Sequence, residues 1–117
     1  MEGCVFCKIV KGELPSKKVI ENDEVVVLYD ISPAAPVHVL VVPKKHIEKL
    51  SESKKKDVEL LGKLQLTAVE AARKLGVEKA FRLITFNGEG AGQSVFHLHY
   101  HLQGGWRGRT PNFHNIK

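Results

Sequence analysis

The stretch His97-Leu98-His99-Tyr100-His101-Leu102 decides how the rest of this chain is interpreted. Its three histidines stand at positions i, i+2 and i+4, with apolar residues between them. Because a β-strand turns successive side chains to opposite faces, a strand here would place all three imidazoles on one face and the apolar side chains on the other. A solvated strand face does not need three titratable rings. We therefore predict a strand over residues 96–103 that carries a metal or phosphate site.

The loop before this segment favours phosphate. Gly88, Gly90 and Gly92 allow the backbone to approach a ligand closely, and successive N–H groups in such loops form anion-binding concavities. Gln93 and Ser94 add side-chain donors. A metal site built from three histidines remains the alternative at this point.

The apolar pattern of the chain predicts an α+β fold. Val58, Leu61 and Leu64 begin a stripe at steps of three, which predicts a helix over 53–75, with Gly76 as its C-terminal cap. Strands are expected over 19–21, 24–29, 37–42, 81–87 and 96–103, and a short helical turn over 6–10. Short connections between the strands favour antiparallel pairing.

Length and composition indicate one domain with a small anionic partner. The chain has 117 residues, 43% of them hydrophobic, and a net charge of +5, which suits a nucleotide or another polyanion. There is no aromatic and basic platform for polymeric nucleic acid, and no apolar run near the ~20 residues of a membrane helix. The N-terminus does not have the pattern of a signal peptide, so we expect a cytoplasmic protein.

The stretch Gly92-Gln93-Ser94-Val95-Phe96, together with the histidine segment after it, resembles the signature of the histidine-triad (HIT) superfamily of nucleotide-binding hydrolases and transferases. Residues 6–10, 30–38 and 41–47, and Gly104-Gly105, are similar to its Hint branch, the histidine-triad nucleotide-binding proteins. The resemblance implies a single HIT domain over 1–117, with a tail from 104. It also implies an antiparallel five-stranded sheet with one long helix and a short N-terminal helix, and a homodimer that joins two sheets into one.

The resemblance also implies a covalent reaction. The middle histidine, His99, would attack the α-phosphorus of a purine nucleoside phosphoramidate or related nucleotide conjugate and form a nucleotidyl-histidine, which water then hydrolyses. His101, Ser94 and His38 would contact the phosphate and the leaving group, and no Mg²⁺ would be required. The alternatives are a dinucleoside polyphosphate hydrolase, and a nucleotide-binding interaction module in which catalysis is incidental.

The same comparison implies a pocket for a purine nucleotide such as AMP. Asp30 would accept hydrogen bonds from both ribose hydroxyls, although by itself it is also a typical cap for the turn that follows. The base would lie in an apolar slot, and the phosphate in a cradle. The slot would be formed by Ile31, Phe6, Ile9 and Leu28, and the cradle by Asn87, Gly92, Gln93, Ser94 and Val95.

The pair Cys4-Val5-Phe6-Cys7 has a spacing common in zinc sites. From the residues alone it is a metal half-site, a redox pair or a coincidence. Some HIT proteins hold a structural zinc with such a pair and two histidines, so the resemblance implies a zinc site formed by Cys4, Cys7, His46 and His97.

Three features depart from the usual HIT pattern. Gln103 stands where the motif normally ends in an apolar residue, and the loop 87–94 is one residue shorter than in familiar Hint members. The tail carries Trp106, Arg107 and Arg109, for which the sequence gives no role.

Overall fold

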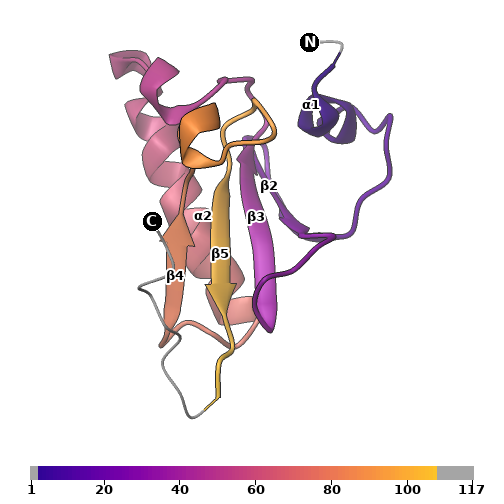
Figure 1. The fold of residues 1–117 in the computed structure, drawn as a ribbon, viewed down its shortest axis with the longest axis vertical. Coiled ribbons are helices and arrows are strands. Elements are labelled where there is room, and N and C mark those ends of the chain that lie inside the picture. Colours follow the sequence, from indigo (N-terminus) through magenta and orange to yellow (C-terminus); the bar gives the residue numbers. More distant parts are fainter. Residues whose placement is uncertain (1–2, 108–117) are drawn as a thin grey trace.

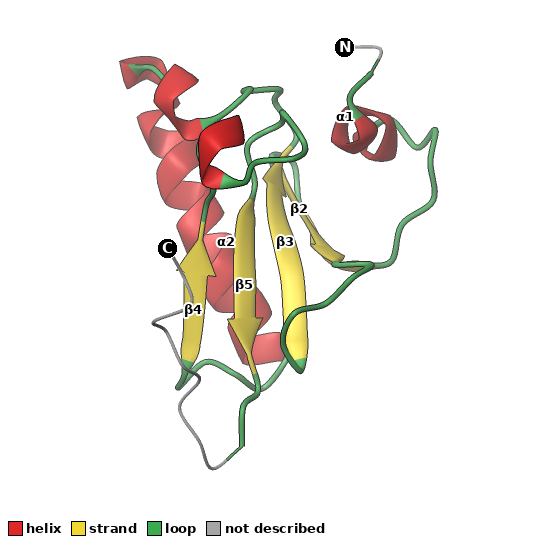
Figure 2. Cartoon of the chain, in the orientation of Figure 1, coloured by secondary structure: helices red, strands yellow, loops and turns green. Residues whose placement is uncertain are grey.

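The computed structural model describes residues 3–107, which form a single sheet with helices on both faces (Figures 1 and 2). The five strands lie in the order β1-β2-β3-β5-β4, and all neighbours are antiparallel. This confirms the predicted α+β class. The elements are α1 (Val5–Val10), β1 (Lys18–Glu21), β2 (Val25–Tyr29), β3 (Val37–Pro43), α2 (Val58–Lys74), β4 (Phe81–Ile84) and β5 (Tyr100–Gly104), with 3₁₀ turns at Leu50–Glu52, Lys55–Asp57 and Glu89–Ala91.

The long helix α2 covers one face of the sheet and forms the larger core with it (Figure 1). Val25 and Val27 of β2 point to this face, as Val39 and Val41 of β3 do, because side chains alternate along each strand. Leu102 of β5 joins them and is fully buried. These strands are therefore apolar toward α2 at every second position.

The short helix α1 lies on the opposite face and forms a second, smaller core. Phe6 and Ile9 of α1 pack against Val26 and Leu28 of β2 and Val42 of β3. Because β2 has apolar side chains on both faces, it is buried on both sides, and its burial pattern is nearly continuous. His38 of β3 and His101 and Gln103 of β5 also lie on this second face.

The helix prediction over 53–75 was wrong at its start. α2 begins at Val58, and residues before it form two 3₁₀ turns. The Asp57 carboxylate accepts the Lys54 N–H at 2.8 Å and closes the second of these turns. Val58, placed in the apolar stripe, is 68% exposed. The C-terminal prediction is confirmed: Gly76 has a φ of 77°, a conformation that glycine adopts without strain.

Two strand predictions were too long. β4 ends at Ile84, because the Thr85 hydroxyl turns to donate to the His99 carbonyl at 2.9 Å. β5 begins only at Tyr100, so His97 and His99 precede the strand ladder. The backbone of this segment bonds to a loop instead: the Leu98 N–H donates to the Ile47 carbonyl at 2.6 Å.

The alternation predicted for the histidine segment nevertheless holds. Leu98 and Leu102 are buried in the core under α2, and Tyr100 packs against it. Within residues 3–107, no helix is long and apolar enough to span a bilayer. Of the tail residues, Trp106 and Arg107 are described, and Arg109 lies outside the described residues.

Candidate functional site

The sheet face opposite α2 brings four polar side chains together from adjacent strands. His38 of β3 pairs in register with Gln103 of β5, and Leu40 pairs with His101. Side chains at positions 101 and 103 of β5 therefore project on the same face as His38. His99, just before β5, joins them, and its ring lies 5.2 Å from the ring of His101. The predicted catalytic histidines are thus neighbours in space.

The backbone fixes the tautomer of His99. Its Nδ1 lies 2.7 Å from the His97 carbonyl oxygen, which can only accept, so Nδ1 carries the proton and donates. Burial lowers the pKa of His99, so the ring is neutral near pH 7. Nε2 is therefore unprotonated and carries a free lone pair, which is the form that a nucleophilic imidazole requires.

A second hydrogen-bond chain orients His101. The Ala34 N–H donates to Nδ1 of His38 at 2.9 Å, so the proton of neutral His38 must lie on Nε2. His38 Nε2 lies 2.9 Å from Nδ1 of His101 and donates to it. Burial lowers the pKa of His38, and burial together with the neighbouring histidines lowers that of His101 to about 4. His101 is then a neutral ring that presents Nε2–H as a donor.

Asp30, directly after β2, lies at the end of this chain of hydrogen bonds. Its Oδ1 accepts the Ser32 N–H at 2.7 Å, which is the turn cap expected from the sequence. Its Oδ2 lies 3.4 Å from His38 Nε2, and the side chain is 15% exposed. One carboxylate oxygen therefore holds the turn, and the other faces the histidines.

The group Asp30, His38 and His101 is close enough to hold a metal ion, with ligand atoms within 4.8 Å of one another. Its hydrogen bonds argue against that use. Because His38 Nδ1 accepts the Ala34 N–H, its Nε2 carries a proton and offers no lone pair to a cation. The chemistry of this group is that of a hydrogen-bond relay.

An apolar cavity of about 580 Å³ opens beside these histidines, within the usual range for small-molecule sites. His99 and His101 line it together with Asp30 and Ser94. All four residues predicted for the base slot also line it: Phe6, Ile9, Leu28 and Ile31. Ile31 is fully exposed, so it offers a free apolar surface at the rim of this nucleotide-sized pocket.

Hydrogen bonds of the Gln93 side chain hold the glycine-rich loop in shape. Gly88 and Gly92 have φ values of 92° and 98°, which favour glycine. The buried Gln93 side chain accepts the Gly88 N–H at 2.8 Å and donates to the carbonyls of Glu48 and Val95. The amide of Gln93 is thus engaged within the loop. Ser94 and Val95, the next two residues, line the pocket.

Three predicted nucleotide contacts lie elsewhere. Asn87 accepts the Ser51 N–H at 2.8 Å and donates to the Ser51 hydroxyl, which ties the loop to the segment before α2. Asn87, Gly92 and Gln93 are not among the described residues that line the pocket. Val5, Lys17 and Leu40 line it although the sequence did not indicate them. Val5 could have been found, since it lies four residues from Ile9 on the same helix face.

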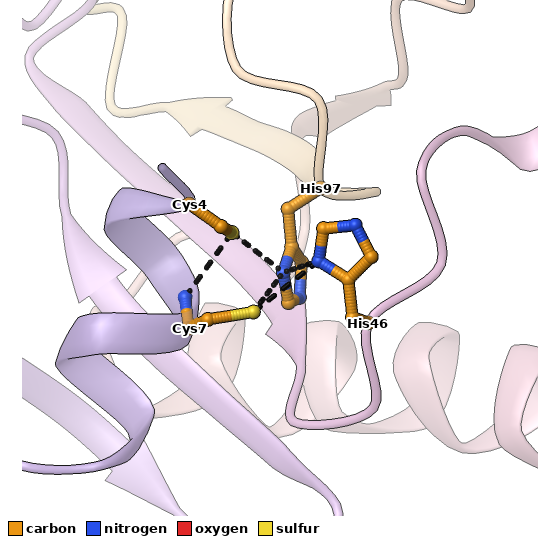
Figure 3. A group of neighbouring side chains, drawn as sticks. All are labelled: Cys4, Cys7, His46 and His97. Carbon is orange, nitrogen blue, oxygen red and sulfur yellow. Dashed lines mark hydrogen bonds between the residues drawn. The ribbon is translucent and has the colours of Figure 1, made fainter. Parts of the chain in front are cut away.

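Cys4, Cys7, His46 and His97 form a compact group at the N-terminus of α1, and Figure 3 shows their side chains turned toward one another. Cys4 Sγ and His46 Nδ1 lie 3.2 and 3.1 Å from His97 Nδ1, and Cys7 Sγ lies 3.2 Å from His46 Nδ1. A tetrahedral zinc with two sulfur and two nitrogen ligands separates its donors by roughly 3.3–3.8 Å. The four residues, predicted together, are compatible with such an ion.

The protonation states of His97 and Cys7 are also compatible with a bound cation. His97 Nε2 lies 2.7 Å from the Pro43 carbonyl and must donate to it, which leaves Nδ1 free to be a ligand. Burial lowers the pKa of His97 to about 4, so the ring is neutral. Burial raises the pKa of Cys7, so forming its thiolate costs free energy. A bound cation offsets this cost because it stabilises the thiolate.

His97 links the cation group to the pocket. Its ring belongs to the cysteine group, while its carbonyl holds Nδ1 of His99. The ring of Phe6, from α1, lies 5.8 Å from the ring of His97 and 5.1 Å from that of His99, edge-on to both. The first histidine of the motif thus supports the second.

Gln103, which departs from the usual motif, is buried behind the histidines. Its Oε1 accepts from Arg82 Nε at 2.7 Å, and its amide nitrogen lies 3.4 Å from His38 Nε2. The Arg82 guanidinium lies over the ring of Trp106, 5.1 Å from its centroid. These contacts attach the beginning of the tail to the histidine face.

Comparisons with known proteins agree with this geometry. A family profile described as "Scavenger mRNA decapping enzyme C-term binding" matches residues 3–108. The chain is 42% identical over 104 residues to protein HitA of Neisseria gonorrhoeae, covering 89% of this chain and 97% of HitA. It is 48% identical to a HIT family hydrolase from Clostridium thermocellum, with a TM-score of 0.89 over 96% of this chain and 98% of that one. A histidine triad protein from Clostridium difficile is 40% identical, with a TM-score of 0.89 and 96% coverage of both chains.

Proposed function

The chain belongs to the histidine-triad (HIT) family, and from this premise we propose that it is a nucleotide-binding hydrolase of purine nucleoside phosphoramidates or related nucleotide conjugates. The observation that carries the proposal is the tautomer of His99. Its Nδ1–H is bound to the His97 carbonyl, so the unprotonated Nε2 belongs to a ring that lines the pocket. We assign the chain to the Hint branch as part of the same proposal.

The residues that line the pocket suggest how a nucleotide binds in it. The base lies between the apolar side chains of α1 and β2, and the ribose hydroxyls donate to Asp30. This places the α-phosphate near His99, His101 and Ser94, at the polar end of the cavity. Backbone N–H groups of Ser94 and Val95, which line the cavity, complete the phosphate contacts, whereas those of Gly92 and Gln93 donate to carbonyls within the loop.

The reaction has two displacements. Nε2 of His99 attacks the α-phosphorus, the P–N bond to the amine breaks, and the amine leaves with the electron pair and takes a proton from water. The Nδ1–H of the resulting nucleotidyl-imidazolium keeps its bond to the His97 carbonyl. Water then attacks phosphorus and releases its proton to solvent, and His99 departs with its electron pair.

His101 and His38 stabilise the charge on the phosphate. His101 donates Nε2–H to a phosphate oxygen, and His38 fixes that tautomer through its own bond to His101. Ser94 donates to the phosphate or to the leaving group. Since these donors are fixed before the substrate binds, the proposed reaction requires no Mg²⁺.

The cysteine group is proposed to hold a structural zinc through Cys4, Cys7, His46 and His97. The donor set and the tautomer of His97 support this assignment. The ion would supply no chemistry to the substrate; it would link the N-terminus of α1 to the segment that carries the nucleophile. We also propose a homodimer, because β4 is an edge strand and Leu66 of α2 is 68% exposed.

One assay tests the proposed activity against its alternatives. Adenosine 5′-phosphoramidate and diadenosine tetraphosphate are offered separately to the wild type and to the His99→Ala variant, and release of AMP is measured. The proposal expects turnover of the phosphoramidate that the variant loses. Faster turnover of diadenosine tetraphosphate would favour a dinucleoside polyphosphate hydrolase, and AMP binding with no turnover of either would leave an interaction module.

A further inference from the structure

Three polar side chains form one row across the sheet face that carries the histidines. Strands β4, β5 and β3 lie side by side (Figure 1). Arg82 of β4 pairs in register with Gln103 of β5, and Gln103 pairs with His38 of β3 on its other side. Directly opposed residues of antiparallel strands have side chains about 5 Å apart, so neighbours in such a row interact. The function proposed above uses His38 and gives Arg82 and Gln103 no role.

Arg82 fixes which way the Gln103 amide faces. A guanidinium can only donate, and Arg82 Nε lies 2.7 Å from Gln103 Oε1, so the amide oxygen faces β4 and the NH₂ group faces β3. Gln103 is 6% exposed, so water offers the amide few other partners. The guanidinium itself lies over the ring of Trp106, 5.1 Å from its centroid. The orientation of the amide is therefore held from the edge strand of the sheet.

The contact between Gln103 and His38 brings two donors together. His38 Nδ1 accepts the Ala34 N–H, so the single proton of the neutral ring lies on Nε2. The Gln103 amide nitrogen lies 3.4 Å from this Nε2, and neither group can accept from the other. If Arg82 did not hold the amide, the amide would gain a hydrogen bond by turning its oxygen toward His38.

A turned amide would compete with His101 for the proton of His38. Its oxygen would accept from His38 Nε2, which now donates to Nδ1 of His101 at 2.9 Å. His101 would then lose the bond that keeps its own proton on Nε2, where it faces the phosphate. The donor-to-donor contact at Gln103 thus prevents His38 from donating in this direction. An unfavourable contact that persists in a buried site indicates that the surrounding structure enforces it.

We propose that Arg82 and Gln103 are positioning residues for this reaction. Arg82 holds the Gln103 amide with its NH₂ group toward His38, so the proton of His38 goes to His101, and His101 presents Nε2–H to the phosphate. The proposal rests on the function proposed above and adds two residues to its site. Neither of them is among the described residues that line the nucleotide pocket, so both act through His38.

The tautomer of His101 is the first readout. It is measured from the nitrogen NMR shifts of the imidazole at about pH 8, where histidine rings are neutral. The wild type should show the Nε2–H form. Arg82→Leu and Gln103→Glu should each show a mixture with the Nδ1–H form, because each variant presents an acceptor to His38. Arg82→Lys, whose ammonium also only donates, should keep the wild-type form. A wild-type tautomer in Arg82→Leu overturns the proposal.

Turnover of adenosine 5′-phosphoramidate is the second readout. Arg82→Leu should lower kcat about tenfold and change KM less than about threefold, because the misplaced donor stabilises charge that develops in the transition state. In the Gln103→Leu background, which has no amide to orient, the same substitution should change kcat less than about twofold. An equal fall in both backgrounds overturns the proposal. Arg73→Leu, at an exposed arginine of α2 that pairs with Glu78, is the matched control and should keep the wild-type kcat.

The failure of the proposed function is distinguishable from the failure of this inference. If the wild type turns over no phosphoramidate, the phosphoramidase function is wrong, but the tautomer of His101 does not depend on turnover. A mixed tautomer in Arg82→Leu would still support the positioning of His101 by Arg82 and Gln103. The wild-type tautomer in that variant would overturn it whatever the activity.

Discussion

The Asp30→Asn substitution removes one acceptor from the nucleotide pocket and leaves the local turn intact. Oδ1 of Asp30 accepts the Ser32 N–H at 2.7 Å, and an asparagine carbonyl oxygen can keep that bond. Oδ2, which lies 3.4 Å from His38 Nε2, becomes an NH₂ group that donates and cannot accept. The variant therefore loses the acceptor proposed to receive the ribose hydroxyls.

The size of the effect follows from the burial and charge of Asp30. Its side chain is 15% exposed, so water competes weakly for the carboxylate. A hydrogen bond to a charged group contributes about 1.5–3 kcal/mol to binding. We expect a loss of about 2 kcal/mol, which raises the Kd for AMP about 30-fold.

Calorimetric titration with AMP and with 2′,3′-dideoxyadenosine monophosphate measures this effect. The wild type should bind AMP about 30-fold more tightly than the dideoxy analogue, and Asp30→Asn should bind the two about equally. Asp23→Asn, in an exposed turn, is the control and should behave as the wild type does. Two results refute the reasoning: no preference for AMP in the wild type, or an equal loss of affinity for both ligands in Asp30→Asn.

Three further predictions concern the metal, the pH and the assembly. Metal analysis should find about one zinc per wild-type chain and almost none in Cys7→Ser. The variant should also lose at least ~2 kcal/mol in the free energy of unfolding, and equal stability of the two proteins contradicts a structural zinc. The pKa of His101 is about 4 in the folded protein and about 6.5 in the unfolded chain, so the unfolded chain takes up a proton first as the pH falls. The stability that neutral His101 gives the folded state is therefore complete above about pH 6.5 and is lost toward pH 4. Urea unfolding at pH 7 and pH 5 should show a fall that is smaller by about 1–2 kcal/mol in His101→Gln, the lower figure allowing for solvent screening of a half-buried ring; an identical fall in both proteins refutes this sign. Sedimentation at micromolar concentration should show a particle of twice 13.0 kDa, and Leu66→Glu should favour the monomer; a monomeric wild type rules out the dimer.

Much of the site could be predicted because strand alternation is a local property. The order of apolar and polar residues from Leu98 to Leu102 places the leucines under α2 whether or not the strand ladder extends that far. The base slot could be predicted for a similar reason, since Phe6 and Ile9 lie on one side of a short helix. Asn87 illustrates the opposite case: its partner, Ser51, is 36 positions away, and no local pattern indicates that contact.

The sequence by itself determined which chemical groups are present and their order along the chain: three imidazoles two residues apart, a glycine-rich loop before them, and two thiols at a metal spacing. Only the tertiary structure decided what each imidazole does. The Pro43 carbonyl turns Nδ1 of His97 toward the cysteines, the His97 carbonyl leaves Nε2 of His99 free, and the Ala34 N–H orients His101 through His38. The physical reason is that a neutral imidazole has one proton for two nitrogens, so its role depends on the partner of each nitrogen, and the fold supplies those partners.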